Sequence, residues 1–246
     1  MGILGFFRGN NNGIPKMDEV DINSITKDEF YQKYFLPRKP VVIRNGAKNW
    51  PLMKLWTENY LISQGGGYQC NIIHDSRPAS SKDRTLLKHY FALHKDKSTL
   101  TLDNYDPNSK IFFLEDITLP NICFNEKDIS RFFFYHANKN GGTLPHSHGD
   151  AFNILREGEK RWVMHDASIK TDPKGNNIMM SFYKQYPAGT HAKEWFSNEL
   201  KTISKKVDKV SQCVQRAGDI VFIPADYSHA VLNNSEVMGL VVETIR

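Results

Sequence analysis

The chain has 246 residues, of which 40% are hydrophobic and 24% are charged. This composition is typical of a folded globular protein and argues against disordered, collagen-like and coiled-coil chains. The net charge of +5 comes from 32 basic and 27 acidic residues. Because the basic residues are dispersed rather than gathered into one stripe, the sequence does not favour a nucleic-acid partner.

Signals for membranes and secretion are not visible in the sequence. No apolar run approaches the roughly 18 residues of a membrane helix, and residues 1–12 lack the basic start and apolar core of a secretory signal. Cys70, Cys123 and Cys213 are widely spaced and follow no disulfide or zinc pattern. We therefore expect an intracellular protein, in the cytoplasm or nucleus, without a membrane span and with reduced thiols. The sequence indicates no oligomeric state.

The first hundred residues predict a flexible arm followed mainly by helices. Residues 1–20 include an Asn/Gly-rich stretch and are expected to form a loose N-terminal arm. Thr26 and Glu29 have the spacing of a capping box, which predicts the start of a helix. Further elements are expected as a strand at 40–43, a helix through Leu61, a strand at 68–73 and a helix at 85–94.

From about residue 110 the chain predicts short strands separated by turn signals. The strands are expected at residues 111–114, 131–136, 151–155, 160–164, 213–216, 220–223, 229–232 and 237–243. A helix at 191–205 interrupts them, and its expected buried residues are Trp195, Phe196, Leu200 and Ile203. Strands with this spacing are typical of an all-β barrel or sandwich. We expect one domain over residues 21–246, with the barrel core in residues 110–246.

Three of the nine histidines have the pattern of one metal site. His146 and His148 are two residues apart, so an extended strand points both to the same face, and Asp150 follows in the same series. His229 opens a later strand. Each of these histidines taken alone is more often a hydrogen-bonded core or surface residue. Taken together, they predict three ligands on one face of a metal, as in facial-triad iron enzymes.

The surrounding motifs resemble those of a known family. Gly218, Pro224, His229 and Asn233 have the spacing of the second cupin motif, with Asp226 at a position where that motif has glycine. The order of these residues is similar to that in the JmjC and cupin-like hydroxylases.

Two further segments resemble the same family, and the resemblance covers residues 20–246 in order. Residues 146–162 (HSHGDAFNILREGEKRW) are similar to its metal strand and Gly-x-Lys-x-Trp run, and residues 30–56 are similar to its N-terminal signature. The His-x-His-Gly stretch resembles small JmjC-only proteins of the jumonji domain-containing protein eight type. The resemblance implies a mainly β double-stranded β-helix, also called a cupin or jelly-roll fold, with N-terminal helices packed outside it.

The resemblance also implies two cofactors, Fe(II) and 2-oxoglutarate. The iron would be held by the strand pair and His229, and the far carboxylate of 2-oxoglutarate would meet Lys160. A buried dicarboxylate needs a fixed cation and polar donors, and Thr143, Asn153 and Asn233 are candidates for the donors. Lys160 could instead be a solvated strand lysine, and Trp162 is expected to be a core residue.

Two assignments of the ligand pair on the first strand are possible. Most family members present His-x-Asp or His-x-Glu, which His148 and Asp150 would reproduce, whereas His146 and His148 would give a pair without a carboxylate. The second assignment places Thr143 three residues before the first ligand and leaves residues 149–151 for the turn, as in the family. We therefore favour His146, His148 and His229, with Asp150 as a supporting residue or alternative ligand.

Three functional hypotheses follow. The first is an Fe(II)/2-oxoglutarate-dependent oxygenase that hydroxylates a side chain of a protein or peptide substrate. The second is a catalytically inactive JmjC-like scaffold or protein-binding module. The third is a three-histidine cupin dioxygenase that acts on a small molecule without 2-oxoglutarate, which would leave Lys160 without a role.

Overall fold

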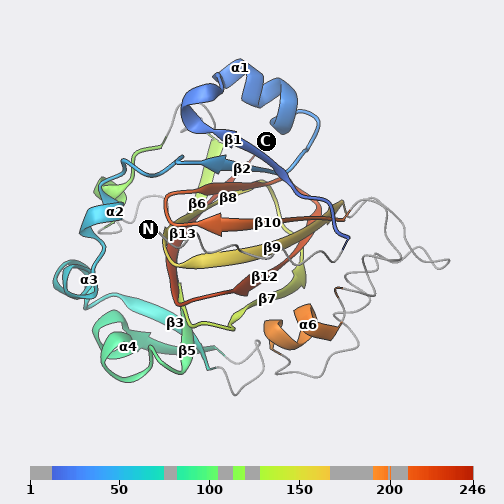
Figure 1. Cartoon of the computed structure of the whole chain (residues 1–246). Helices are drawn as coiled ribbons and strands as arrows, with labels where there is room; N and C mark the ends of the chain where they lie inside the picture. The colour runs from blue at the N-terminus through green and yellow to red at the C-terminus, as the bar shows by residue number, and fades with distance from the viewer. Residues whose placement is uncertain are drawn as a thin grey trace, which may run out of the picture.

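The computed structural model describes residues 13–74, 82–104, 113–119, 128–166, 191–198, 200 and 210–245. These residues form two β-sheets with helices outside them (Figure 1). The expectations for residues 1–12, the strand at 111–112, Cys123 and Ile203 lie outside the described residues. Within the described part of the chain, no helix is long and apolar enough to cross a membrane.

The larger sheet has nine strands among the described residues, and the smaller has four. In pairing order the larger sheet contains β1 (Asp18–Asp21), β2 (Val41–Arg44), β11 (Ile220–Ile223), β8 (Ala151–Glu157), β13 (Val237–Thr244), β6 (Ile129–Ala137), β5 (Ser98–Asn104), β3 (Gln69–His74) and β4 (Lys82–Leu86). The smaller sheet contains β10 (Val210–Arg216), β9 (Glu159–Asp166), β12 (Tyr227–Asn233) and β7 (Gly142–His146). Only the β1–β2 pair among these is parallel.

The helices cover the outer faces of the two sheets. On one side lie α2 (Leu52–Leu55), α3 (Glu58–Gly65) and α4 (Leu87–Leu93), whereas α6 (Ala192–Asn198) lies on the opposite side (Figure 1). The remaining helical segments are α1 (Lys27–Phe30), a π-helical turn at Tyr31–Phe35 and 3₁₀ turns at Ile22–Ser24 and Leu114–Asp116. The predicted capping box is confirmed, because Thr26 and Glu29 each accept a hydrogen bond from the backbone N–H of the other.

Because side chains alternate between the two faces of each strand, an inner core lies between the sheets and the outer cores lie outside them. On β8, Phe152 and Ile154 pack against the core beneath the N-terminal helices, whereas Ala151 and Leu155 face the space between the sheets. Trp162 of the smaller sheet packs in the same inner core. Burial of one face of each sheet against the other gives a jelly-roll arrangement. The predicted fold class, mainly β with helices, is confirmed.

Most predicted elements after residue 128 occur within one to three residues of their expected bounds. The strand predicted at 220–223 matches β11, and the helix predicted at 191–205 is present at α6, with Trp195, Phe196 and Leu200 buried. The strand predicted at 111–114 is wrong in its described part, because a 3₁₀ turn begins at Leu114. The pair Phe113 and Leu114 instead packs its side chains against the outer core.

The N-terminal half differs from expectation in three ways. Residues 13–20 are not a loose arm: Ile14 and Met17 are buried, and β1 begins at Asp18. Five strands between Asp18 and Asn104 extend the larger sheet: β2 and β3 confirm the strands predicted at 40–43 and 68–73, whereas β1, β4 and β5 were not predicted. The helix predicted at 85–94 starts only at Leu87, because residues 85–86 pair with β3, and Leu93 is 70% exposed rather than core. A single domain over residues 21–246 stays a prediction.

Candidate metal centre

Three histidine side chains meet at one end of the space between the sheets. His146 ends β7, His148 lies in the turn that follows, and His229 lies on β12 directly opposite His146. One ligand nitrogen from each histidine lies within 4.8 Å of the others. The ring centroids of His146 and His148 are 4.2 and 4.7 Å from that of His229. The structure thus brings together three of the four residues that the sequence suggested as metal ligands.

The three rings use the same nitrogen, Nδ1, for a hydrogen bond to a backbone carbonyl oxygen. Nδ1 of His146 lies 2.9 Å from the Leu144 carbonyl oxygen, and Nδ1 of His148 lies 2.8 Å from that of Gly149. Nδ1 of His229 lies 3.0 Å from the Tyr227 carbonyl oxygen. A carbonyl oxygen only accepts, so each Nδ1 carries a proton, and in a neutral ring Nε2 then keeps its lone pair. This is the tautomer that a metal bound through Nε2 requires.

Burial keeps two of these rings in the neutral form. Desolvation lowers the pKa of His229 well below its ordinary value, and the neighbouring His146 and His148 lower it further. Desolvation is also the main reason why the pKa of His146 is lowered. Since a metal ion binds neutral imidazole and competes with protons, this environment favours metal binding.

Asp150 lies beside the centre but does not belong to it. Its side chain is buried, and its Oδ1 accepts a hydrogen bond of 2.7 Å from the backbone N–H of Ala225. The backbone N–H of Asp226 donates to the His148 carbonyl oxygen at 3.1 Å. These two bonds join the turn that carries His148 to the turn before His229. Among the described residues, no carboxylate joins the three histidines.

The departure of Asp226 from the cupin motif has a physical explanation. Asp226 has a φ of +66°, in the left-handed region where glycine is most easily accommodated. Aspartate is one of the few other residues that enters this region with modest strain. The backbone therefore keeps the conformation that the motif's glycine would supply, and the exposed carboxylate is 3.1 Å from the Arg38 guanidinium.

Lys160 lies deeper in the same interior and is 7% exposed. Its Nζ is 3.6 Å from the ring centroid of Tyr135 and 5.6 Å from that of Trp162. Within the described residues, no carboxylate is within ion-pair distance of this ammonium. Desolvation alone lowers the pKa of Lys160 to about 7. A buried ammonium without a counter-ion is costly, and this one is suited to receive an anion.

Four residues surround Lys160 and are called, together with it, the Lys160 cluster: Tyr135, Asn153, Trp162 and Asn233. Tyr135 donates a hydrogen bond of 2.9 Å to Oδ1 of Asn153. Asn233 lies directly opposite Lys160, and its buried Oδ1 has no hydrogen-bond partner in the part of the chain that the structure describes. Trp162 connects the cluster to the histidines, because its ring centroid is 5.9 Å from that of His229.

Two of the three predicted polar donors are therefore beside Lys160, and one is not. Asn153 and Asn233 are buried, whereas Thr143 is exposed on the edge strand β7. A register shift between His229 and Val231 changes the alignment of β7 with β12, so counting residues back from His146 did not place Thr143 correctly.

Sequence reasoning missed Tyr135 and underrated Trp162. Tyr135 follows Phe132, Phe133 and Phe134, so the pattern around it gave no sign of which aromatic residue faces inward. Its phenol fits because the facing residue is Gly239, where an added Cβ would lie 2.3 Å from the phenol oxygen. Trp162 is a core residue as expected, but it also lies between Lys160 and His229.

The donors present fit a divalent metal and an anionic co-ligand. Three imidazoles suit iron, zinc, copper or nickel and leave coordination positions open. The buried ammonium of Lys160 and the amide oxygen of Asn233 are polar groups whose interactions the described residues leave incomplete.

Comparisons with known proteins point the same way. No family model matches the chain. Arginine-specific demethylase JMJ22 of Arabidopsis thaliana is 20% identical over an alignment of 237 positions, which covers 89% of this chain and 44% of the relative. The bifunctional arginine demethylase and lysyl-hydroxylase psr-1 of Caenorhabditis elegans is 25% identical over an alignment of 252 positions, gaps included, which covers 91% of this chain and 60% of the relative. Its Caenorhabditis briggsae counterpart is 24% identical, with 87% and 58% covered.

These homologues are JmjC-type enzymes. They support the resemblance seen in the motifs, at modest identity. The chain spans only about half the length of the curated relatives that it matches.

Proposed function

We propose that this protein is a JmjC-type oxygenase that uses Fe(II) and 2-oxoglutarate to hydroxylate a side chain of a protein or peptide. One observation carries the proposal: one ring nitrogen from each of three imidazoles lies within 4.8 Å of the others, in the same barrel interior as a buried ammonium that has no counter-ion among the described residues. A metal and a dicarboxylate together would complete both sites. The homologous enzymes support this reaction class.

Each part of the site has a distinct task in this proposal. His146, His148 and His229 would hold the iron, which supplies oxygen activation coupled to oxidative decarboxylation of 2-oxoglutarate. Lys160 binds the far carboxylate, and this charge pair offsets the desolvation of both ions. The rings of Tyr135 and Trp162 exclude water around the ammonium, which strengthens the pair.

A protein substrate is the class that the relatives support. Their names specify arginine demethylation and lysyl hydroxylation, and these activities belong to proteins that are longer than the matched region. For this chain we propose hydroxylation of a protein side chain without naming the residue. The intracellular location and the likeness to the jumonji domain-containing protein eight type stay predictions.

A catalytically inactive, metal-binding JmjC-like protein is a second candidate, and the ligand set favours it. Three neutral imidazoles leave the full +2 charge on the metal, whereas a carboxylate ligand would reduce it to +1. That difference alters how strongly the metal binds anions and activates oxygen. A three-histidine dioxygenase without 2-oxoglutarate is disfavoured, because it gives the buried Lys160 no task.

An anaerobic titration distinguishes the proposals. The purified protein is loaded with Fe(II) and titrated with 2-oxoglutarate, and the visible charge-transfer band of the chelate is followed. We expect a saturable band and, on admission of air, formation of succinate. Lys160→Ala should weaken 2-oxoglutarate binding by about 1.5–3 kcal/mol, the value of a charge-assisted contact, with little change in iron content.

Lys193→Ala is the matched control, because Lys193 is exposed on α6. It should bind 2-oxoglutarate like the wild type. Iron binding without a band and without succinate would contradict the oxygenase and favour the inactive metal protein. Equal 2-oxoglutarate affinity in Lys160→Ala and the wild type would return Lys160 to a structural role.

A further inference from the structure

Gln215 is a fully buried amide on the inner face of β10, and all of its hydrogen-bonding groups are engaged. Its Oε1 accepts a hydrogen bond of 2.9 Å from the Trp162 indole N–H. Its Nε2 donates to the backbone oxygens of Asn153 at 2.8 Å and Asp219 at 3.2 Å. One acceptor and two donors meet matching partners, so the orientation of the amide is fixed.

These bonds reach both aromatic rings that face the Lys160 ammonium. Trp162 is held directly through its indole N–H. Tyr135 is held through Asn153, whose backbone oxygen accepts from Gln215 while its side-chain oxygen accepts from the Tyr135 hydroxyl. The two rings come from β9 and β6, which belong to different sheets. Gln215 therefore fixes the distance between the two sides of the Lys160 cluster.

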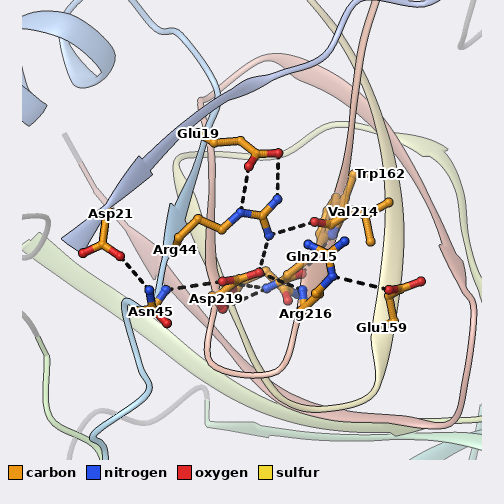
Figure 2. A network of polar contacts seen from close by, with 11 residues as sticks. Glu19, Asp21, Arg44, Asn45, Glu159, Trp162, Val214, Gln215, Arg216 and Asp219 are labelled. Carbon is orange, nitrogen blue, oxygen red and sulfur yellow. Dashed lines mark hydrogen bonds and ion pairs between the residues drawn. The ribbon is translucent and has the colours of Figure 1, made fainter. Parts of the chain in front are cut away.

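The opposite side of Gln215 is anchored in a polar network around Arg44 and Asp219 (Figure 2). This network is remote from the histidines, because Gln215 faces Lys160 near the start of β9, whereas His229 faces Met164 near its end. Asp219 accepts hydrogen bonds from the Arg44 guanidinium and from the backbone N–H of Arg216. Arg44 also donates to the Val214 carbonyl oxygen at 3.0 Å and pairs with Glu19 at 2.7 Å. Because every member of this network has a partner, it is a rigid base for the Gln215 amide.

We propose that Gln215 is a positioning residue for the anion site at Lys160: it fixes Trp162 and Tyr135 around the ammonium. The identity of the anion as 2-oxoglutarate rests on the proposed function, whereas the positioning itself does not. Gln215 is the direct cross-strand neighbour of Lys160, but its side-chain hydrogen bonds go to Trp162, Asn153 and Asp219 and not to Lys160. In this proposal its amide therefore acts on the ammonium through Trp162 and Asn153.

Three variants test this inference. Gln215→Met keeps the length and volume of the side chain but removes the amide, which leaves the Trp162 N–H buried and unpartnered. Gln215→Glu, when protonated, retains one acceptor and one donor. Gln212→Met is the matched control, because Gln212 lies on the other face of the same strand and bonds to Arg161 and Ile14 instead.

The first readout is the affinity for the two ligands. Gln215→Met should bind 2-oxoglutarate about tenfold more weakly, as expected for one or two lost buried hydrogen bonds, while its iron affinity stays within about twofold. Gln215→Glu should approach the wild type at pH 6 and lose affinity as rising pH ionises the carboxyl group against two carbonyl oxygens. Gln212→Met should show neither effect. Equal weakening of iron and 2-oxoglutarate would indicate a general structural role and overturn the proposal.

The second readout needs no 2-oxoglutarate and separates this inference from the proposed function. Nuclear magnetic resonance follows the Trp162 indole N–H, assigned with Trp162→Phe, and the titration of the Lys160 side chain, assigned with Lys160→Met. In Gln215→Met the indole signal should shift, and Lys160 should titrate at higher pH because water enters the loosened cluster. If both are unchanged, the positioning role is wrong. If both change but the wild type binds no 2-oxoglutarate, only the proposed function fails.

Discussion

Two adjoining polar regions of the barrel interior differ in how their polar groups are satisfied. In the network remote from the histidines, the side chains of Arg44, Asp219 and Gln215 find hydrogen-bond partners within the protein. In the Lys160 cluster, which adjoins this network where Lys160 faces Gln215, the ammonium has no counter-ion and the Oδ1 of Asn233 has no hydrogen-bond partner among the described residues. Buried polar groups whose partners are all in the protein stabilise the fold, whereas buried polar groups without partners indicate where a ligand binds.

This difference has an energetic consequence. A buried ammonium without a counter-ion destabilises the ligand-free protein, and the low pKa of Lys160 is a measure of that cost. The remote network carries several charges, but each lies against an opposite charge or a backbone partner. Replacing a buried cation by methionine should therefore raise the free energy of unfolding in the Lys160 cluster and lower it in the remote network.

The largest expected effect is loss of the metal. His229→Ala and His146→Ala should each remove most of the bound divalent metal, because only two imidazoles remain. Elemental analysis after loading and desalting measures this directly, with the wild type expected to hold close to one metal per chain. His89→Ala, at an exposed position on α4, is the control and should retain the metal. Equal metal in the wild type and His229→Ala would remove the site assignment.

The second effect is a gain of stability on removing Lys160. In ligand-free Lys160→Met, the free energy of unfolding should rise by several kcal/mol at pH 6. Burial lowers the pKa of Lys160 in the wild type, and each pH unit of this lowering corresponds to about 1.4 kcal/mol. Below pH 7 the lysine of the wild type is charged in both the folded and unfolded states, so the full penalty applies. Between about pH 7 and the ordinary lysine pKa, the unfolded state binds the extra proton and the wild type gains stability as pH rises.

Urea unfolding of both proteins at pH 6, 8 and 10 tests this sign. The advantage of Lys160→Met should be largest at pH 6 and shrink toward pH 10. Lys193→Met controls for a general effect of removing one positive charge. A variant that is less stable than the wild type at pH 6 would show that the ammonium has a stabilising partner.

The sequence predicted the barrel strands well because their signals are local. Alternating apolar residues and turn signals identify β8 and β11 without knowledge of their partners. Of the five N-terminal strands of the larger sheet, β2 and β3 were predicted and β1, β4 and β5 were not. β5 reaches its place by pairing with β6, which the sequence around β5 does not indicate. The burial of Ile14 and Met17 also depends on distant strands, since residues 15–17 bond to Gln212 of β10.

The site was predictable where a motif defines it and not where it depends on strand pairing. The spacing of His146, His148 and His229 was sufficient to bring them together. The sequence could not decide the part played by Asp150, because its hydrogen-bond partner is a backbone N–H in a turn 75 residues away. Gln215 carries no motif signal, and only the pairing of β10 with β9 places it beside Trp162.

A third prediction concerns the remote network. Arg44→Met leaves Asp219 and Glu19 without their shared guanidinium, and breaking a partly buried ion pair in this way costs about 2–4 kcal/mol. The free energy of unfolding in urea should fall by this amount, opposite in sign to Lys160→Met. Metal content should stay as in the wild type. Loss of metal with unchanged stability would contradict the division of the interior into a structural network around Arg44 and a ligand-binding region around Lys160 and the histidines.

The smallest expected effect concerns Asp150 and decides between a ligand and an anchor. As an anchor, Asp150 holds the turn of His148 against the turn before His229 through its bond to the Ala225 N–H. Asp150→Ala should then lower metal affinity by about tenfold, as expected when a residue that orients a ligand is removed. Asp150→Asn keeps an oxygen acceptor in the same place and should bind metal within about threefold of the wild type, or roughly 0.6 kcal/mol. As a ligand, Asp150 would lose its charged oxygen in either variant, so both would release the metal while His146→Ala retained it. A competitive titration with a chromogenic chelator separates the two outcomes, and near-native affinity in Asp150→Asn requires the metal to be held by histidines alone.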